Sequence, residues 1–206
     1  MPSLVFNAEN HLYLLDGKPL PSITQIIKPL VDYGMVPPAV LENAANFGKA
    51  VHKLVELEEE GTLDADALDD KLVPVINAYR EWRATNGVLP YESAPACEIP
   101  MAHVKLGYAG TPDLIFDGLA VVEIKTRKTN KLTDPIQTAA QELLWRANGG
   151  AKGDYSHHVL ELYADGRHKF ETFTKAEKKL GLARFRYMLD ALKMNQTIQS
   201  WKGQKS

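Results

Sequence analysis

The feature that most constrains the fold of this chain is a change in sequence texture close to residue 91. Before that point, apolar residues recur at three- and four-residue steps, which is the spacing of amphipathic helices. After it, Pro100 and Pro112 interrupt any helical pattern, and short β-prone runs are separated by tight-turn pairs such as Asp117-Gly118. The sequence therefore predicts a single α/β domain of the α+β kind, with helices first and a central mixed sheet second.

The expected elements follow from capping residues, apolar periodicity and turn residues. The expected helices span residues 22–28, 37–60, 67–85, 134–147 and 174–194. A hairpin turning at Asp16-Gly17 opens the chain, and the later expected strands span 97–102, 104–108, 112–116, 120–126, 157–164 and 168–174. These elements divide the domain (1–206) into an N-terminal hairpin with helices (1–90), a core (91–195) and a polar tail (196–206) that we expect to be flexible.

Composition excludes several protein classes. A single cysteine, Cys97, cannot form an internal disulfide or supply the four thiolates of an iron–sulfur cluster. No apolar run approaches the roughly 18 residues of a membrane span, so we expect a cytoplasmic protein with no membrane partner.

The net charge of −2 is unevenly distributed along the chain. Residues 1–120 hold 8 basic and 17 acidic side chains, a net −9, whereas residues 121–206 hold 16 basic and 9 acidic ones, a net +7. This polarity is compatible with one basic face that meets phosphates, and equally with uneven decoration of the surface.

Two acidic residues, Asp113 and Glu123, lie on consecutive expected strands joined by the turn at 117–118. Pairing across that turn places Asp113 near position 122 and leaves Asp113 and Glu123 approximately across from each other, so both carboxylates can project from the same end of the hairpin. Carboxylates held this close repel each other, a cost that a bound cation normally offsets. Hard oxygen ligands suit Mg²⁺ or Mn²⁺, and the backbone carbonyl of Ile124 is a further expected ligand.

Lys125 follows Glu123 by two positions, so along a strand both side chains face the same way. A fixed cation there can position an attacking water or neutralise charge that grows on phosphorus oxygens. The spacing alone is a weak signal, because charged residues alternate along any half-exposed strand. The basic residues Arg127, Lys128 and Lys131 follow directly, and we interpret them as contacts to DNA phosphates rather than as a solvated loop.

Other segments add to this signal. Glycines and a proline in residues 107–112 come directly before Asp113 and suit close backbone approach by a ligand. His52 lies on the long helix 37–60, next to its apolar face. Gln137 and Gln141 are four residues apart, so they share one helix face, either in a site or simply in solvent.

Taken together, these motifs resemble the RecB-type branch of the PD-(D/E)xK nucleases. In chain order they are Gly-x-x-x-His at 48–52, Gly-x-x-Asp at 110–113, Glu-x-Lys at 123–125 and Gln-x-x-x-Gln at 137–141. The resemblance implies a restriction-endonuclease-like core with flanking helices and an N-terminal extension. It implies a metal-dependent DNA nuclease, most simply an exonuclease that acts on DNA ends in recombination, repair or phage DNA metabolism.

The resemblance also assigns roles by position. Asp113, Glu123 and His52 would bind Mg²⁺ or Mn²⁺, Lys125 would be the catalytic lysine, and Gln137 would orient that lysine or contact DNA.

One position departs from the family pattern. Position 141 is Gln where the family usually has Tyr, which puts the contacts of that Tyr in doubt. We expect Gln141 to contact DNA and Trp145 to be able to supply an aromatic face. Glu56 and Glu98 lie near acidic positions of the family, but neither is assigned as a ligand.

The implied partner is DNA, in the cytoplasm of a bacterium or of a phage-infected host. A single-strand annealing protein and further copies of this chain are partners expected from phage recombination systems. With one cysteine, the iron–sulfur cluster of some relatives is not expected. The alternative hypothesis is a catalytically inactive, accessory DNA-binding module with a nuclease-like fold; Gln141 favours it, and the intact Asp113, Glu123 and Lys125 set argues against it.

Overall fold

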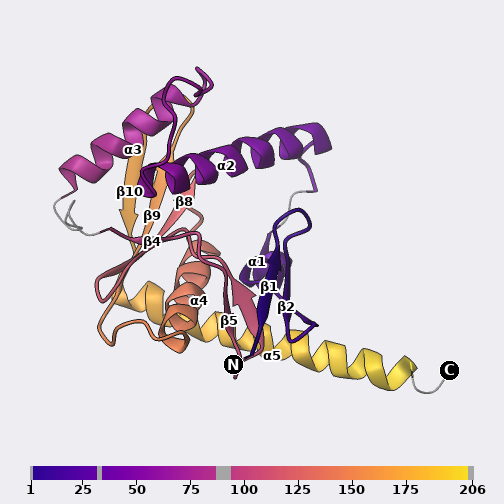
Figure 1. Cartoon of the computed structure of the whole chain (residues 1–206). Helices are drawn as coiled ribbons and strands as arrows, with labels where there is room; N and C mark the ends of the chain where they lie inside the picture. The colour runs from indigo at the N-terminus through magenta and orange to yellow at the C-terminus, as the bar shows by residue number, and fades with distance from the viewer. Residues whose placement is uncertain (1, 32–33, 87–93, 204–206) are drawn as a thin grey trace.

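The computed structural model describes residues 2–31, 34–86 and 94–203 (Figure 1). Its strands are β1 (Leu4–Asn7), β2 (Leu12–Leu15), β3 (Lys18–Leu20), β4 (Ala96–Cys97), β5 (Met101–His103), β6 (Tyr108–Gly110), β7 (Leu114–Phe116), β8 (Ala120–Lys125), β9 (Ser156–Leu162) and β10 (His168–Thr172). Its helices are α1 (Ile23–Ile27), the 3₁₀ helix η1 (Lys28–Leu30), α2 (Pro38–Glu59), α3 (Val73–Thr85), α4 (Asp134–Ala147) and α5 (Lys175–Gly203).

The central element is a five-stranded mixed sheet with the strand order β10-β9-β8-β7-β4. Strands β8 and β9 are parallel because α4 carries the chain back across the sheet between them, and the other neighbouring strands are antiparallel. Strands β1 to β3 form a separate antiparallel sheet, the N-terminal sheet, and β5 pairs with β6. The mixed α/β class expected from the sequence is therefore confirmed.

Helices cover both faces of the central sheet (Figure 1). On one face, Leu114, Val122 and Ile124 pack in one buried cluster with side chains of α2 and α3, such as Val51 and Trp82. On the other face, Ile115 and Val121 form a second cluster with Tyr155, against which Trp145 of α4 packs. Because side chains alternate along β8, Glu123 faces the α4 side, as Val121 does.

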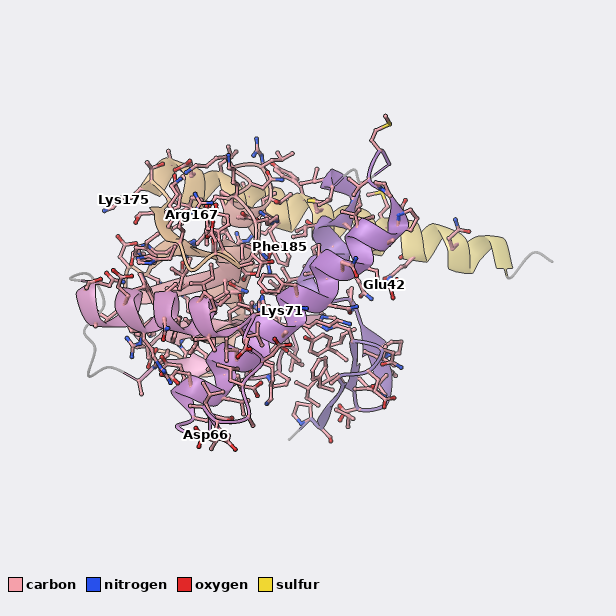
Figure 2. The ribbon with its side chains drawn as sticks, turned by 90° about the horizontal axis from the view of Figure 1, so that it is seen from above. Glu42, Asp66, Lys71, Arg167, Lys175 and Phe185 are labelled. Carbon is pink, nitrogen blue, oxygen red and sulfur yellow. The ribbon has the colours of Figure 1, made fainter. Side chains whose placement is uncertain are left out.

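The N-terminal sheet lies beside α2, to one side of the central sheet, in both views (Figures 1 and 2). The expected turn at Asp16-Gly17 is confirmed: both residues have positive φ (49° and 75°), and the turn joins β2 to β3. The expected capping box is also present, because Ser22 and Gln25 exchange hydrogen bonds at the start of α1.

Several expected boundaries are wrong. Helix α3 starts at Val73 rather than at residue 67, and Pro74 in its first turn suits that start. The expected strand 97–102 is two strands, β4 and β5, and residues 104–107 form a turn with Gly107 at φ 63° instead of a strand. The tail is not flexible coil over residues 196–203, because α5 continues to Gly203. Residues 204–206 and the boundary expected between 90 and 91 lie outside the described residues.

Helix α5 crosses the start of α4 at very short range at Gly181. A Cβ atom at this position would lie 2.2 Å from the carbonyl oxygen of Pro135. We expect Gly181→Ala to lower the free energy of unfolding by about 1–3 kcal/mol, because the two helices must separate to admit the methyl group. Gly48→Ala on α2 is the matched control, since its nearest atom is Thr126 Oγ1 at 3.8 Å. Urea unfolding measures both, and equal loss in the two variants would contradict the close approach.

Among the helices in the described ranges, none combines the length and the apolar composition needed to cross a bilayer.

Candidate functional site

Three side chains able to bind a metal meet at one end of the central sheet. His52 comes from α2, Glu98 from the residue after β4, and Asp113 from the residue before β7. Each offers one ligand atom, and these atoms all lie within 4.8 Å of one another. His52 Nδ1 lies 3.0 Å from Glu98 Oε1 and 3.3 Å from Asp113 Oδ1. We call these residues the His52 cluster.

The β7–β8 pairing positions the acidic residues of the hairpin. Leu114 pairs with Val122, so Asp113 lies across from Glu123. The turn has three residues, 117–119, rather than the expected two, which moves the partner of Asp113 from position 122 to Glu123. The second oxygen of Asp113 accepts a hydrogen bond of 2.6 Å from the amide of Ile124, which fixes the carboxylate against β8. The side chain of Ile124 is buried in the α2-side core, as expected. The role of its carbonyl as a metal ligand stays a prediction.

Glu123 is held by three donors from two elements. Its Oε1 accepts hydrogen bonds from Lys125 Nζ (2.5 Å) and Gln137 Nε2 (2.6 Å), and its Oε2 accepts one from Gln141 Nε2 (2.5 Å). Lys125 Nζ also donates to Gln137 Oε1 at 3.1 Å. The Glu123 side chain is almost fully buried, and this network fixes the direction in which Lys125 points.

Opposite charges hold the site together. Burial lowers the pKa of His52, but the carboxylates of Asp113 and Glu98 outweigh that effect and raise it well above its usual value. Burial raises the pKa of Asp113, yet His52 and Lys125 bring it below the ordinary value. Burial and the charge of Asp113 raise the pKa of Glu123 to about 7 in spite of Lys125. A metal ion bound between His52, Glu98 and Asp113 would offset the same negative charge that raises the pKa of His52.

The group of ligand atoms differs from the one expected from the sequence in one member. Glu123 was expected to bind the metal with His52 and Asp113, but both of its oxygens are occupied by Lys125, Gln137 and Gln141. Glu98, which the sequence did not assign, instead lies beside the imidazole with Asp113, and metal binding by Glu123 stays a prediction.

Glu98 was not assigned a role from the sequence, and its backbone is unusual. It has a φ of 48°, a left-handed conformation that a residue other than glycine adopts rarely. Its amide donates to the carbonyl oxygens of Pro112 (3.1 Å) and Asp113 (3.3 Å), so the strained residue is tied to the segment that carries Asp113. The other acidic position left unassigned, Glu56, instead pairs with Lys53 at 2.8 Å. A strained backbone that aims a carboxylate into a cluster is a signal of function.

The structure corrects the expectations for two residues of α4. Gln141 was expected to contact DNA, but it is 1% exposed and its amide instead fixes Glu123. Trp145 was offered as an aromatic face for the site, but its Nε1 donates to Asp117 Oδ1 at 2.7 Å, at the opposite end of the β7–β8 hairpin. Gln141 still lines the cavity over the cluster, and its Oε1 has no hydrogen-bond partner among the described residues, so contact of this oxygen with DNA stays a prediction.

The basic residues after β8 differ from one another. Arg127 makes two hydrogen bonds to the buried Asp134 (2.8 and 3.1 Å), so part of its role is to hold the loop that leads into α4. Lys131 pairs with Glu171 at 2.6 Å, and its charge is therefore largely compensated. Lys128 is exposed. Phosphate contact by these three residues stays a prediction, with Lys128 the freest to make it.

A cavity of about 330 Å³ opens over the cluster and is lined by His52, Glu98, Asp113, Glu123 and Lys125, among others. Two further cavities, of about 390 and 470 Å³, adjoin it, since each of them is also lined by Lys125. Lys125 thus lies where the three hollows meet. A larger cavity of about 770 Å³ lies elsewhere, between α2 and α3. Its charged side chains pair with each other, as Arg80 does with Glu58 and Arg83 with Glu59.

Comparison with known proteins adds no family assignment: no protein-family model matches the chain, and no curated protein sequence matches it significantly.

Proposed function

We propose that this chain is a metal-dependent DNA nuclease with a restriction-endonuclease-like core of the RecB-type PD-(D/E)xK kind. The observation that carries the proposal is the meeting of His52, Glu98 and Asp113 beside a Lys125–Glu123 pair at the base of one cavity. Four of these five residues belong to the motifs that carry the resemblance. They come from α2, β8 and the segment before β7, which are far apart in the sequence.

The chemistry of the donor atoms fits a hard divalent cation. Two carboxylates and one imidazole within 4.8 Å of one another suit Mn²⁺ or Mg²⁺, with positions left for water and phosphate oxygens. We propose that His52, Glu98 and Asp113 hold the cation, which requires the neutral form of the His52 imidazole. When bound, such a cation polarises a phosphodiester and lowers the pKa of bound water.

Lys125 supplies the fixed positive charge of the proposed site. Its ammonium group is held between Glu123 and Gln137, so it meets a phosphate group without having to be ordered first. From there it neutralises negative charge that grows on the phosphoryl oxygens during hydrolysis. Gln137 and Gln141 act as positioning residues, because each donates a hydrogen bond to Glu123.

The finer assignment belongs to the same proposal. We propose an exonuclease that acts on DNA ends in recombination, repair or phage DNA metabolism, with an annealing protein or further copies of the chain as partners. This assignment rests on the motif order and on the N-terminal sheet.

The test is incubation of the purified chain with linear and circular DNA in Mg²⁺, Mn²⁺ or EDTA. We expect degradation of linear DNA with either metal and none in EDTA, and no activity in Asp113→Ala. Cleavage that persists in EDTA or in Asp113→Ala would contradict the mechanism. Salt-sensitive DNA binding without any metal-dependent cleavage would support the accessory DNA-binding module instead.

A further inference from the structure

The cavity over the His52 cluster has a second wall that the proposed chemistry does not use. This wall comes from the N-terminal sheet and the start of α1, and it includes Phe6, His11, Tyr13 and Thr24, with Thr111 beside them. Two aromatic rings and one imidazole therefore share a hollow of about 330 Å³ with the acidic residues of the site.

The rings of this wall form one packed group. Phe6 and Tyr13 are stacked, with ring centroids 4.5 Å apart and an angle of 23° between their planes. The His11 imidazole stands edge-on to both, at 5.5 Å from Phe6 and 5.3 Å from Tyr13. Tyr13 is fully buried, whereas Phe6 is half-buried and His11 is exposed. The buried ring supports two others whose surfaces remain accessible.

One hydrogen bond fixes this group relative to the acidic residues, and His11 has an unusual backbone conformation. The Tyr13 hydroxyl and Thr111 Oγ1 are 2.7 Å apart, a hydrogen bond between the N-terminal sheet and the segment that leads to Asp113. His11 has a φ of 51°, a conformation in which glycine or asparagine is usual. An imidazole at a strained turn on the wall of a cavity indicates a role for its side chain.

The two sides of the hollow differ in chemistry. The wall of Phe6, His11 and Tyr13 offers aromatic and imidazole rings, which suit a nucleobase rather than a phosphate. On the other side, Lys125 leads into the adjoining cavity of about 390 Å³ that Lys28 and Arg127 also line. A strand that places its phosphate at Lys125 can therefore turn a base toward Phe6 and His11.

We propose that Phe6 and His11 form a stacking platform for an unpaired nucleobase, and that the nuclease acts on single-stranded DNA or on frayed ends. This inference rests on the proposed function and specifies its substrate. Asp113 and Glu123 are only 4% and 1% exposed at the base of the cavity. A paired base in a duplex is stacked on its neighbours and cannot present its face to this wall, whereas a base of a single strand can.

The first test measures binding of a fluorescent 15-nucleotide single strand and of a blunt duplex by anisotropy, in EDTA so that neither is cleaved. We expect wild type to prefer the single strand, and Phe6→Leu and His11→Asn each to weaken that binding by about fivefold or more. Leu keeps the apolar packing of Phe6, and Asn tolerates the left-handed backbone of His11, so both variants isolate the ring. Val5→Ala is the matched control, because Val5 is 55% exposed on β1 and is not part of the cavity wall.

An abasic strand provides the second test. If the rings stack on bases, a fully abasic oligonucleotide should bind wild type and His11→Asn equally. The inference would be overturned if wild type bound a blunt duplex as tightly as the single strand, or if single-strand binding were unchanged in both ring variants.

Metal-dependent cleavage of a blunt duplex at the same rate in wild type and in His11→Asn would contradict the inference and leave the proposed function intact. Binding of single strands that depends on Phe6 and His11, without any metal-dependent cleavage, would support the stacking platform and contradict the proposed nuclease activity.

Discussion

Replacement of Lys125 by methionine should lower metal-dependent DNA cleavage by about a hundredfold or more while Mn²⁺ binding stays close to that of wild type. Removal of one group that stabilises developing charge typically costs a factor of about 10² to 10³ in rate. Lys125 is not one of the three residues in the His52 cluster, and its ammonium group contacts Glu123 and Gln137 instead. Its loss should therefore act on the reaction rather than on the metal.

Methionine is chosen because it keeps most of the side-chain length and apolar surface of Lys125. The variant leaves Glu123 buried without its cation, which favours the neutral form of a carboxyl whose pKa is already raised to about 7. Thermal unfolding must therefore accompany the assay, to exclude loss of fold as the cause. Lys152→Met, at an exposed position outside the cavities that Lys125 lines, is the matched control and should cleave like wild type. Cleavage by Lys125→Met at the wild-type rate would remove Lys125 from the mechanism.

Local sequence signals determined the part of the site around β8. The Asp117-Gly118 signal located the hairpin and brought Asp113 close to Glu123 without knowledge of the rest of the fold. A two-residue turn would have set Asp113 opposite Val122, whereas the turn has three residues, 117–119, and sets it opposite Glu123. The two-residue period of a strand put Lys125 on the side of Glu123, where its ammonium group reaches the Glu123 carboxylate. The four-residue period of a helix gave Gln137 and Gln141 one common face, which packs on Glu123.

The parts that depend on long-range pairing could not be obtained this way. Glu98 reaches the site because β4 pairs with β7, and nothing in the expected strand 97–102 showed that it breaks after Cys97 or which strand it pairs with. Tyr13 reaches Thr111 across 98 residues of sequence. The side chains of the basic loop also required the structure, because the partners of Lys131 and Arg127 lie in β10 and α4. Tertiary packing decides whether a charged side chain is exposed or paired, and the spacing of residues in the sequence does not reveal it.

The ends of two helices also could not be predicted from local sequence signals. The polar composition of residues 196–203 gave no apolar stripe to extend the last helix, yet α5 continues through them. In the expected helix 67–85, apolar residues such as Leu68 and Leu72 matched the helical period, but they pack on the core from turns that precede α3. Apolar periodicity indicates that one side of a segment is buried. Because turns can bury residues at the same spacing, it does not by itself identify a helix.

Replacement of Glu98 by glutamine should weaken Mn²⁺ binding by about 10- to 100-fold, although Glu98 belongs to none of the motifs that carry the resemblance. Replacement of residues that only support the ligands of a metal site already weakens metal binding by this much. Replacement of a direct ligand should therefore weaken it at least as much. Glutamine keeps the size of the side chain and its ability to hydrogen-bond to His52, which Glu98 contacts at 3.0 Å. The variant therefore removes the charge and leaves the shape, and isothermal titration with Mn²⁺ measures the result.

Glu56→Gln is the matched control for Glu98→Gln. Glu56 lies one helical turn from His52 on α2, but its carboxylate pairs with Lys53 and is not part of the His52 cluster. We expect it to bind Mn²⁺ like wild type, and Asp113→Asn to lose binding at least as strongly as Glu98→Gln. Equal affinity in wild type and Glu98→Gln, with binding lost in Glu123→Gln instead, would return the third ligand to the residue expected from the sequence. That outcome would mean that Glu123 leaves Lys125 and the two glutamines when the metal binds, and that the strained backbone of Glu98 orients His52.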